Sequence, residues 1–274
     1  MGVTIGVISI KGGVGKTTIS SSLATDLANH YGKKVLLIDA NYSAPNLGLH
    51  MDVVEPIKTI HEVINGKARI QSAIHKRYGV DVIPGNYNYG KFLQCLRLKD
   101  RIAQVKKDYD FVIIDSSPSL NDEILSTMIA SDSLLVVSTP DYPTLSCSLR
   151  AAQLAKQRGK PISGIIINKI RDPKYELTLD DFEETMGIPV MARIPDDKKA
   201  IRSVFTRIPM PLYKRRSGFS REINNLGAAL TNSNEGKSWF ADLFQWNVNK
   251  ERVNREILRE GFYKNVFEIG RREV

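Results

Sequence analysis

Short apolar runs alternate with amphipathic stretches along most of this chain. Unbroken apolar runs are typical of strands that are covered on both faces of a parallel sheet, and apolar positions at helical spacing are typical of helices. The runs predict strands at residues 4–10, 35–38, 80–83, 111–114, 133–138, 162–168 and 188–192. The stretches between them predict helices at residues 17–31, 58–64, 89–107, 122–130, 144–158, 179–185 and 220–231. This alternation predicts an α/β fold with a largely parallel central sheet and helices on both faces.

The segment between the first predicted strand and the first predicted helix is rich in glycine and lysine. In such a turn the backbone N–H groups point at phosphate oxygens, and the helix that follows adds the positive end of its dipole. Lys16 is expected to reach the β- and γ-phosphates of a nucleotide, and the Thr17 hydroxyl is expected to ligate Mg²⁺. The predicted phosphate-binding residues are Lys11, Gly12, Gly13, Val14, Gly15, Lys16, Thr17 and Thr18.

A second lysine distinguishes this loop from the common G-x-x-x-x-G-K-[ST] pattern. Ile10 stands where that pattern has its first glycine, and Lys11 precedes the glycine pair. In this respect the sequence resembles the MinD/ParA family of deviant Walker A ATPases. The resemblance implies that Lys11 crosses a dimer interface and touches the partner's ATP. It therefore implies a homodimer that is held together by ATP.

Polar residues follow the second and fourth predicted strands. Asp39 resembles the first aspartate of the family's D-x-D switch, which acts near Mg²⁺, and Asp115 resembles the Walker B aspartate, which holds the ion. Asn41 stands where the family has the aspartate that orients or deprotonates the attacking water. An amide can hold a water molecule but cannot take its proton. We therefore expect slow or partner-stimulated hydrolysis, unless another residue has taken over the role of Asn41.

Two later segments resemble the family's base pocket. Asn168 ends the predicted strand at 162–168, and the resemblance implies that its amide pairs with the adenine edge. Pro195 and Asp196 belong to a turn that the resemblance places on the other side of the base. The resemblance covers residues 2–232 and implies ATP and Mg²⁺ as cofactors.

Composition agrees with an intracellular enzyme. The chain has 274 residues, of which 42% are apolar, so it can bury a substantial core. Its cysteines, Cys95 and Cys147, form no CxxC pair, and no signal peptide or membrane span is recognisable, so we expect a cytoplasmic protein. A shared iron–sulfur cluster is an alternative role for the two cysteines. It is disfavoured because Cys95 lies in an apolar stretch without glycines.

The last third of the chain carries most of the positive charge. Residues 198–274 contain 16 Lys or Arg and 8 Asp or Glu, whereas the whole chain has a net charge of +9. A charge asymmetry of this size favours contact with DNA or an anionic membrane, although a merely solvated basic face stays open. The basic cluster comprises Arg202, Arg207, Lys214, Arg215, Arg216 and Arg221.

Two apolar stretches close the chain. Residues 238–246 place Trp239, Phe240 and Phe244 on one helical face, and residues 249–274 predict a second helix with Val253 and Ile257 on its apolar side. Packing within the protein or its dimer is the favoured role of these stretches, and contact with a membrane surface or with a partner protein are the alternatives. We therefore expect an ATPase domain at 1–232 and a helical extension at 233–274.

Together these features predict a cytoplasmic switch ATPase that positions or segregates cargo. ATP and Mg²⁺ would close a homodimer that binds DNA or an anionic membrane, at the inner membrane face or the nucleoid, and an activating partner would stimulate hydrolysis. A hydrolysis-poor, ATP-binding dimeric scaffold is the alternative, and a metabolic phosphotransferase built on the same loop also stays open.

Overall fold

One mixed sheet with helices on both faces forms the centre of this protein. The computed structural model describes residues 2–87, 89, 93–231, 250–251, 253–255 and 257–258. Within them the strand order is β3-β4-β2-β5-β1-β6-β7-β8, and every neighbouring pair is parallel except β3 and β4. The strands are β1 (Val3–Ile8), β2 (Val35–Ala40), β3 (His75–Arg77), β4 (Val80–Ile83), β5 (Phe111–Ser116), β6 (Ser133–Ser138), β7 (Ile162–Ile170) and β8 (Val190–Pro195).

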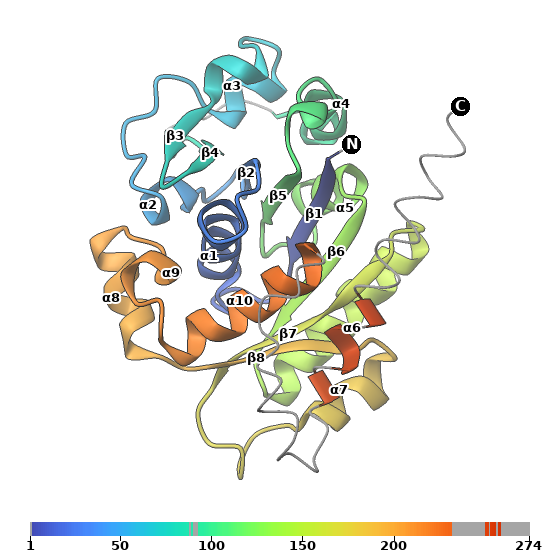
Figure 1. The fold of residues 1–274 in the computed structure, drawn as a ribbon. Coiled ribbons are helices and arrows are strands. Elements are labelled where there is room, and N and C mark those ends of the chain that lie inside the picture. Colours follow the sequence, from blue (N-terminus) through green and yellow to red (C-terminus); the bar gives the residue numbers. More distant parts are fainter. Residues whose placement is uncertain are drawn as a thin grey trace.

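Helices cover the sheet in two layers (Figure 1). The described α-helices are α1 (Lys16–Asn29), α2 (Leu47–His50), α3 (Ile60–Ile64), α4 (Leu98–Ala103), α5 (Asp122–Ala130), α6 (Tyr142–Gln157), α7 (Leu179–Met186), α8 (Lys198–Thr206), α9 (Met210–Tyr213) and α10 (Gly218–Thr231). Apolar side chains of α1, α2, α9 and α10 form one core cluster with the strands. Side chains of α3 to α7 form the clusters on the opposite face. Because both faces are covered, central strands such as β2 are buried at every position.

The predicted α/β architecture is confirmed, and the strands at 80–83 and 133–138 have the predicted bounds. The helix predicted at 89–107 is wrong over much of its length. Residues 93–94 are not helical, α4 ends at Ala103, and the short 3₁₀ turns η2 (Cys95–Arg97) and η3 (Lys106–Asp108) flank it. A third such turn, η1 (Ile70–Ala73), precedes β3. The antiparallel edge strand β3 was not predicted because its three residues are polar and show no period.

Part of the predicted C-terminal helix is described, and it packs against α7 and β8. Asn254 donates hydrogen bonds to the Glu183 carboxylate (2.6 Å) and to the Val190 carbonyl (3.0 Å), and Leu258 is buried in the core. Val253 and Ile257, predicted as the apolar face, are instead exposed. The aromatic stretch 238–246 and the rest of the extension lie outside the described residues. Within the described part of the chain, no helix has the length and apolarity needed to cross a bilayer.

Candidate nucleotide-binding site

The glycine-rich loop leaves β1 and turns directly into α1. Gly13 and Gly15 adopt left-handed backbone conformations, with φ of 78° and 96°, which glycine reaches at little cost. Gly15 is the residue before the first helical position, so α1 begins at Lys16. The loop is held from β7, since Asn168 Nδ2 donates to the Val14 carbonyl (2.7 Å) and Lys169 Nζ donates to the Gly13 carbonyl (2.7 Å).

A pocket of about 440 Å³ lies against this loop at the carboxyl ends of the strands. Its lining unites segments that are far apart in sequence. The predicted residues that line it are Gly12, Gly13, Gly15, Lys16, Thr17, Thr18, Asn41, Asn168, Pro195 and Asp196. The remaining predicted residues are not among the lining residues. Val14, Asp39 and Asp115 are buried, and Lys11 is exposed on the loop.

The two predicted aspartates lie side by side on the neighbouring strands β2 and β5. The register of β2 and β5 pairs Asp39 with Asp115, and both side chains are fully buried. Burial and the neighbouring Asp115 raise the pKa of Asp39 to about 8. Burial raises the pKa of Asp115 to about 6, although Thr17, Lys16 and Ser20 oppose the shift. A buried carboxylate pair of this kind favours a cation beside it.

The donor set fits Mg²⁺. Ser20 Oγ donates to Asp115 Oδ1 (3.1 Å), whereas the buried Asp115 Oδ2 has no hydrogen-bond partner within the described residues. The Thr17 hydroxyl lies close by and donates to Asn46 Oδ1 (3.0 Å). Both oxygens of Asp39 accept backbone N–H groups, from Asn41 (3.0 Å) and Leu47 (3.1 Å). Thr17 and Asp115 would therefore hold the ion, and Asp39 would mainly hold the switch segment in place.

The two lysines of the loop stand in different environments. Lys16 is 7% exposed, and burial lowers its pKa although Asp115 opposes the shift. Lys11 is exposed, and its backbone N–H donates to Ser9 Oγ (3.3 Å). The pKa of the nearby Asp141 carboxylate is lowered overall. Burial raises this pKa, but hydrogen bonds from Thr139 and Thr144 and the charge of Lys11 together outweigh that effect. Lys16 thus faces inward, and Lys11 lies where a second molecule can meet it.

Asn41 is fixed by its own segment. Its Nδ2 donates to the Ala44 carbonyl (2.6 Å), and its buried Oδ1 has no hydrogen-bond partner among the described residues. That oxygen can accept a hydrogen bond from a water molecule. It cannot remove a proton at neutral pH.

The far side of the pocket contains residues that the sequence analysis missed. Asp196 forms an ion pair with Arg171 (2.6 Å), and Ala200, Ile201 and Val204 of α8 line the same wall. His50 and Phe219 also line the pocket. The sequence did contain a signal for α8, because an aspartate before a short amphipathic stretch is typical of a helix start. In the structure Asp197 caps α8 by accepting a hydrogen bond from the Lys199 N–H (2.9 Å).

Glu123 is a further buried group beside the switch segment. Its Oε1 accepts the Ser43 N–H (3.1 Å), and its Oε2 has no partner among the described residues. The Cys95 thiol lies near it; burial, Glu123 and Asp122 raise the pKa of this thiol to about 11. Within the part of the chain that the structure describes, no group of three His, Cys, Asp or Glu residues is arranged to hold a metal.

Known proteins resemble this chain over most of its length. A family model described as an AAA domain matches residues 2–156. The septum site-determining protein MinD of Thermotoga maritima is 33% identical over 239 residues, covering 82% of this chain and 87% of that protein. An uncharacterised ATP-binding protein of Methanocaldococcus jannaschii is 31% identical over 229 residues, covering 82% and 87%.

A solved structure gives the same result. MinD of Pyrococcus horikoshii in complex with Mg-ADP superposes with a TM-score of 0.80 at 25% identity, covering 90% of this chain and 100% of that one. Because of the family model and these similarities over most of the chain, we conclude that the chain belongs to the MinD/ParA family of deviant Walker A P-loop ATPases, with ATP and Mg²⁺ as its cofactors.

Proposed function

We propose that this protein is an ATP-dependent dimerising switch. Two copies would enclose ATP and Mg²⁺, and Lys11 of each copy would reach the partner's nucleotide. The observation that supports this proposal is the different placement of the two lysines: Lys16 is buried and lines the pocket, whereas Lys11 is exposed on the same loop and is not among the lining residues. A lysine beside a phosphate loop that does not face its own pocket is free to stabilise charge on a second molecule.

The experiment is light scattering behind size exclusion with ATP–Mg²⁺ and with ADP. The wild type is expected to dimerise with ATP only, and Lys11→Ala to stay monomeric while still binding nucleotide. Lys67→Ala, which removes an exposed lysine on another part of the fold, is the matched control. A Lys11→Ala protein that dimerises like the wild type would refute the role of Lys11.

We further propose that hydrolysis is slow because Asn41 positions water without taking its proton. The loss of a general base typically costs about 10²–10⁴ in rate. Asn41→Asp is therefore expected to hydrolyse ATP at least tenfold faster than the wild type, with Asn41→Ala as the control that removes both abilities. If Asn41→Asp were no faster, another residue would supply the base and the proposal would be wrong.

An ATP-binding scaffold that barely hydrolyses is the second candidate, and the hydrogen bond that occupies Asn41 Nδ2 favours it. Steady-state ATPase assays with DNA, with anionic vesicles and with neither separate the two. Stimulation by DNA or vesicles supports the switch. Equal low rates in all three conditions support the scaffold.

We propose that the switch binds either DNA or an anionic membrane. The protein would then be associated with the nucleoid or peripheral to the membrane, and its function would be to position cargo. Support comes from the basic cluster around α8 to α10, in which Lys214, Arg216 and Arg221 are exposed, whereas Arg207 is paired with Asp52 (3.5 Å). Electrostatic binding of this kind weakens with salt.

Flotation with anionic vesicles, with plasmid DNA as a competitor, decides between the two surfaces. ATP-dependent flotation that Trp239→Glu abolishes would assign the membrane and the aromatic stretch. Salt-sensitive retention on DNA would assign the basic cluster. An activating partner protein is proposed in either case, since slow hydrolysis leaves the release step to be triggered.

A further inference from the structure

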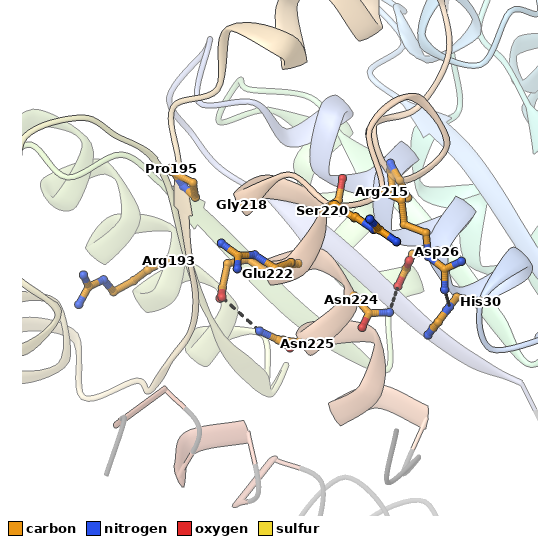
Figure 2. Close-up of a pocket in the computed structure, with 13 residues that line it drawn as sticks. Asp26, His30, Arg193, Pro195, Arg215, Gly218, Ser220, Glu222, Asn224 and Asn225 are labelled. Carbon is orange, nitrogen blue, oxygen red and sulfur yellow. Dashed lines mark hydrogen bonds between the residues drawn. The ribbon is translucent and has the colours of Figure 1, made fainter. Parts of the chain in front are cut away.

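A second pocket, of about 800 Å³, lies beside the nucleotide pocket on the α1 and α10 side of the sheet. Its walls come from the end of α1, from β8, from the segment that precedes α10 and from the first half of α10 itself (Figure 2). Pro195 lines both pockets, so the two are neighbours without being the same site. The residues that line it are Asp26, His30, Arg193, Pro195, Pro211, Arg215, Arg216, Gly218, Ser220, Arg221, Glu222, Asn224 and Asn225.

Positive charge dominates this lining, with four arginines against two carboxylates. Both carboxylates are already engaged within the wall. Asp26 accepts a hydrogen bond from Asn224 (3.2 Å), and burial raises its pKa. Glu222 accepts from Asn225 (3.1 Å) and pairs with Arg255 (3.3 Å). Figure 2 shows the Asn224–Asp26 and Asn225–Glu222 contacts as dashed lines.

The arginines divide into engaged and available ones. Arg193 pairs with Glu251 (3.4 Å). Arg215 donates to His30 Nδ1 (2.9 Å), and Figure 2 shows these two side chains next to each other. Arg216 and Arg221 are exposed on the pocket wall and form no ion pair with any residue in the described part of the chain. Two guanidinium groups without an acidic partner, converging on one cavity, are the usual means of holding phosphate, because each can donate two parallel hydrogen bonds.

We propose that this cavity is a second anion site, in which Arg216 and Arg221 bind a small soluble phosphate ester or polyphosphate. The ligand chemistry follows from the walls: apart from Pro195, Pro211 and Gly218, every lining residue carries a polar or charged side chain, so the cavity offers hydrogen bonds and positive charge to an anionic ligand. The volume lies in the range of small-molecule pockets. Ser220, which is buried, and Asn224, which is half-buried, add polar groups to the wall between the arginines.

The site requires neither dimerisation nor hydrolysis, so its test is independent of the proposed switch. Calorimetric titration of the full-length protein with sodium tripolyphosphate is performed with saturating ADP and without Mg²⁺. ADP then fills the phosphate loop, and the probe is not consumed by chelation. The variants are Arg216→Ala/Arg221→Ala and the matched control Arg150→Ala/Arg158→Ala, which removes the same charge from α6 on the opposite face of the sheet.

We expect one tripolyphosphate site, at least tenfold weaker in Arg216→Ala/Arg221→Ala and within twofold of the wild type in the control. The single variant Arg221→Glu, at an exposed position that folding does not require, is expected to weaken binding similarly. Absence of binding, or equal weakening in both double variants, would overturn the proposal. Displacement of the probe by short duplex DNA or by phosphatidylglycerol vesicles at equal phosphate concentration would overturn the assignment to a small soluble ligand. Failure of both to displace it would support that assignment.

Discussion

Replacing Gly15 by alanine should damage both stability and nucleotide binding. Gly15 has a φ of 96°, where a side chain costs about 1–2 kcal/mol. An added Cβ would lie 2.4 Å from Asn168 Nδ2, which is too close, so the Asn168 amide must move away. This movement breaks the buried hydrogen bond from Asn168 to the Val14 carbonyl, which contributes about 1 kcal/mol. The expected loss in the free energy of unfolding is about 2–3 kcal/mol.

Gly187→Ala is the matched control for this change. Gly187 also has a positive φ, 63°, but an added Cβ there meets no atom within 4 Å. Its substitution should therefore cost about 1–2 kcal/mol from backbone strain alone.

Thermal unfolding and ADP titration measure the two effects. At about 2–4 °C per kcal/mol, Gly15→Ala should lower the melting temperature by roughly 5–10 °C and weaken ADP binding severely, because the loop that holds the phosphates is displaced. Gly187→Ala should lower the melting temperature less and leave the affinity for ADP unchanged. A Gly15→Ala protein that binds ADP like the wild type would refute the claim that β7 holds the phosphate loop in its binding conformation.

Three further changes test other parts of the structure. His61 is buried, with its ring nitrogens hydrogen-bonded to the Tyr42 carbonyl (2.9 Å) and the Asn86 N–H (3.1 Å), and burial lowers its pKa below 6.5. The free energy of unfolding should therefore fall as the pH decreases below 6.5, because the unfolded chain binds the proton more readily. His61→Gln should flatten this slope in urea titrations, and an unchanged slope would contradict the prediction. Thr17→Val removes a hydroxyl beside Asp115. In calorimetry it should weaken the binding of Mg-ADP about tenfold and leave the binding of ADP without Mg²⁺ nearly unchanged. Equal weakening of both would argue against a role of Thr17 as a metal ligand. Asn254→Ala should release the segment 250–258 from β8 and increase its protease sensitivity, with Ile257→Ala, an exposed position, as the silent control.

The sequence by itself determined the local parts of this protein. The strand β1, the phosphate loop and the start of α1 are contiguous, so glycine spacing and apolar runs were sufficient to place Gly12 to Gly15 between a strand and a helix. The same reasoning failed at residues 93–94 and for α8. In the first case an apolar stretch did not form the expected helix. In the second, a helix of the pocket wall that is only nine residues long was missed, although its sequence is amphipathic.

Only the tertiary structure decided how distant residues meet. Asp39 and Asp115 are neighbours because of the register of β2 against β5. The hydrogen bond from Asn168 to Val14 joins residues that are 154 positions apart. The arginine-lined pocket likewise requires α1, β8 and α10 to come together. Periodicity records which face of each element is buried, but not which element covers it. Strand order and register supply that information, and they set the burial that shifts the pKa values and shapes both pockets.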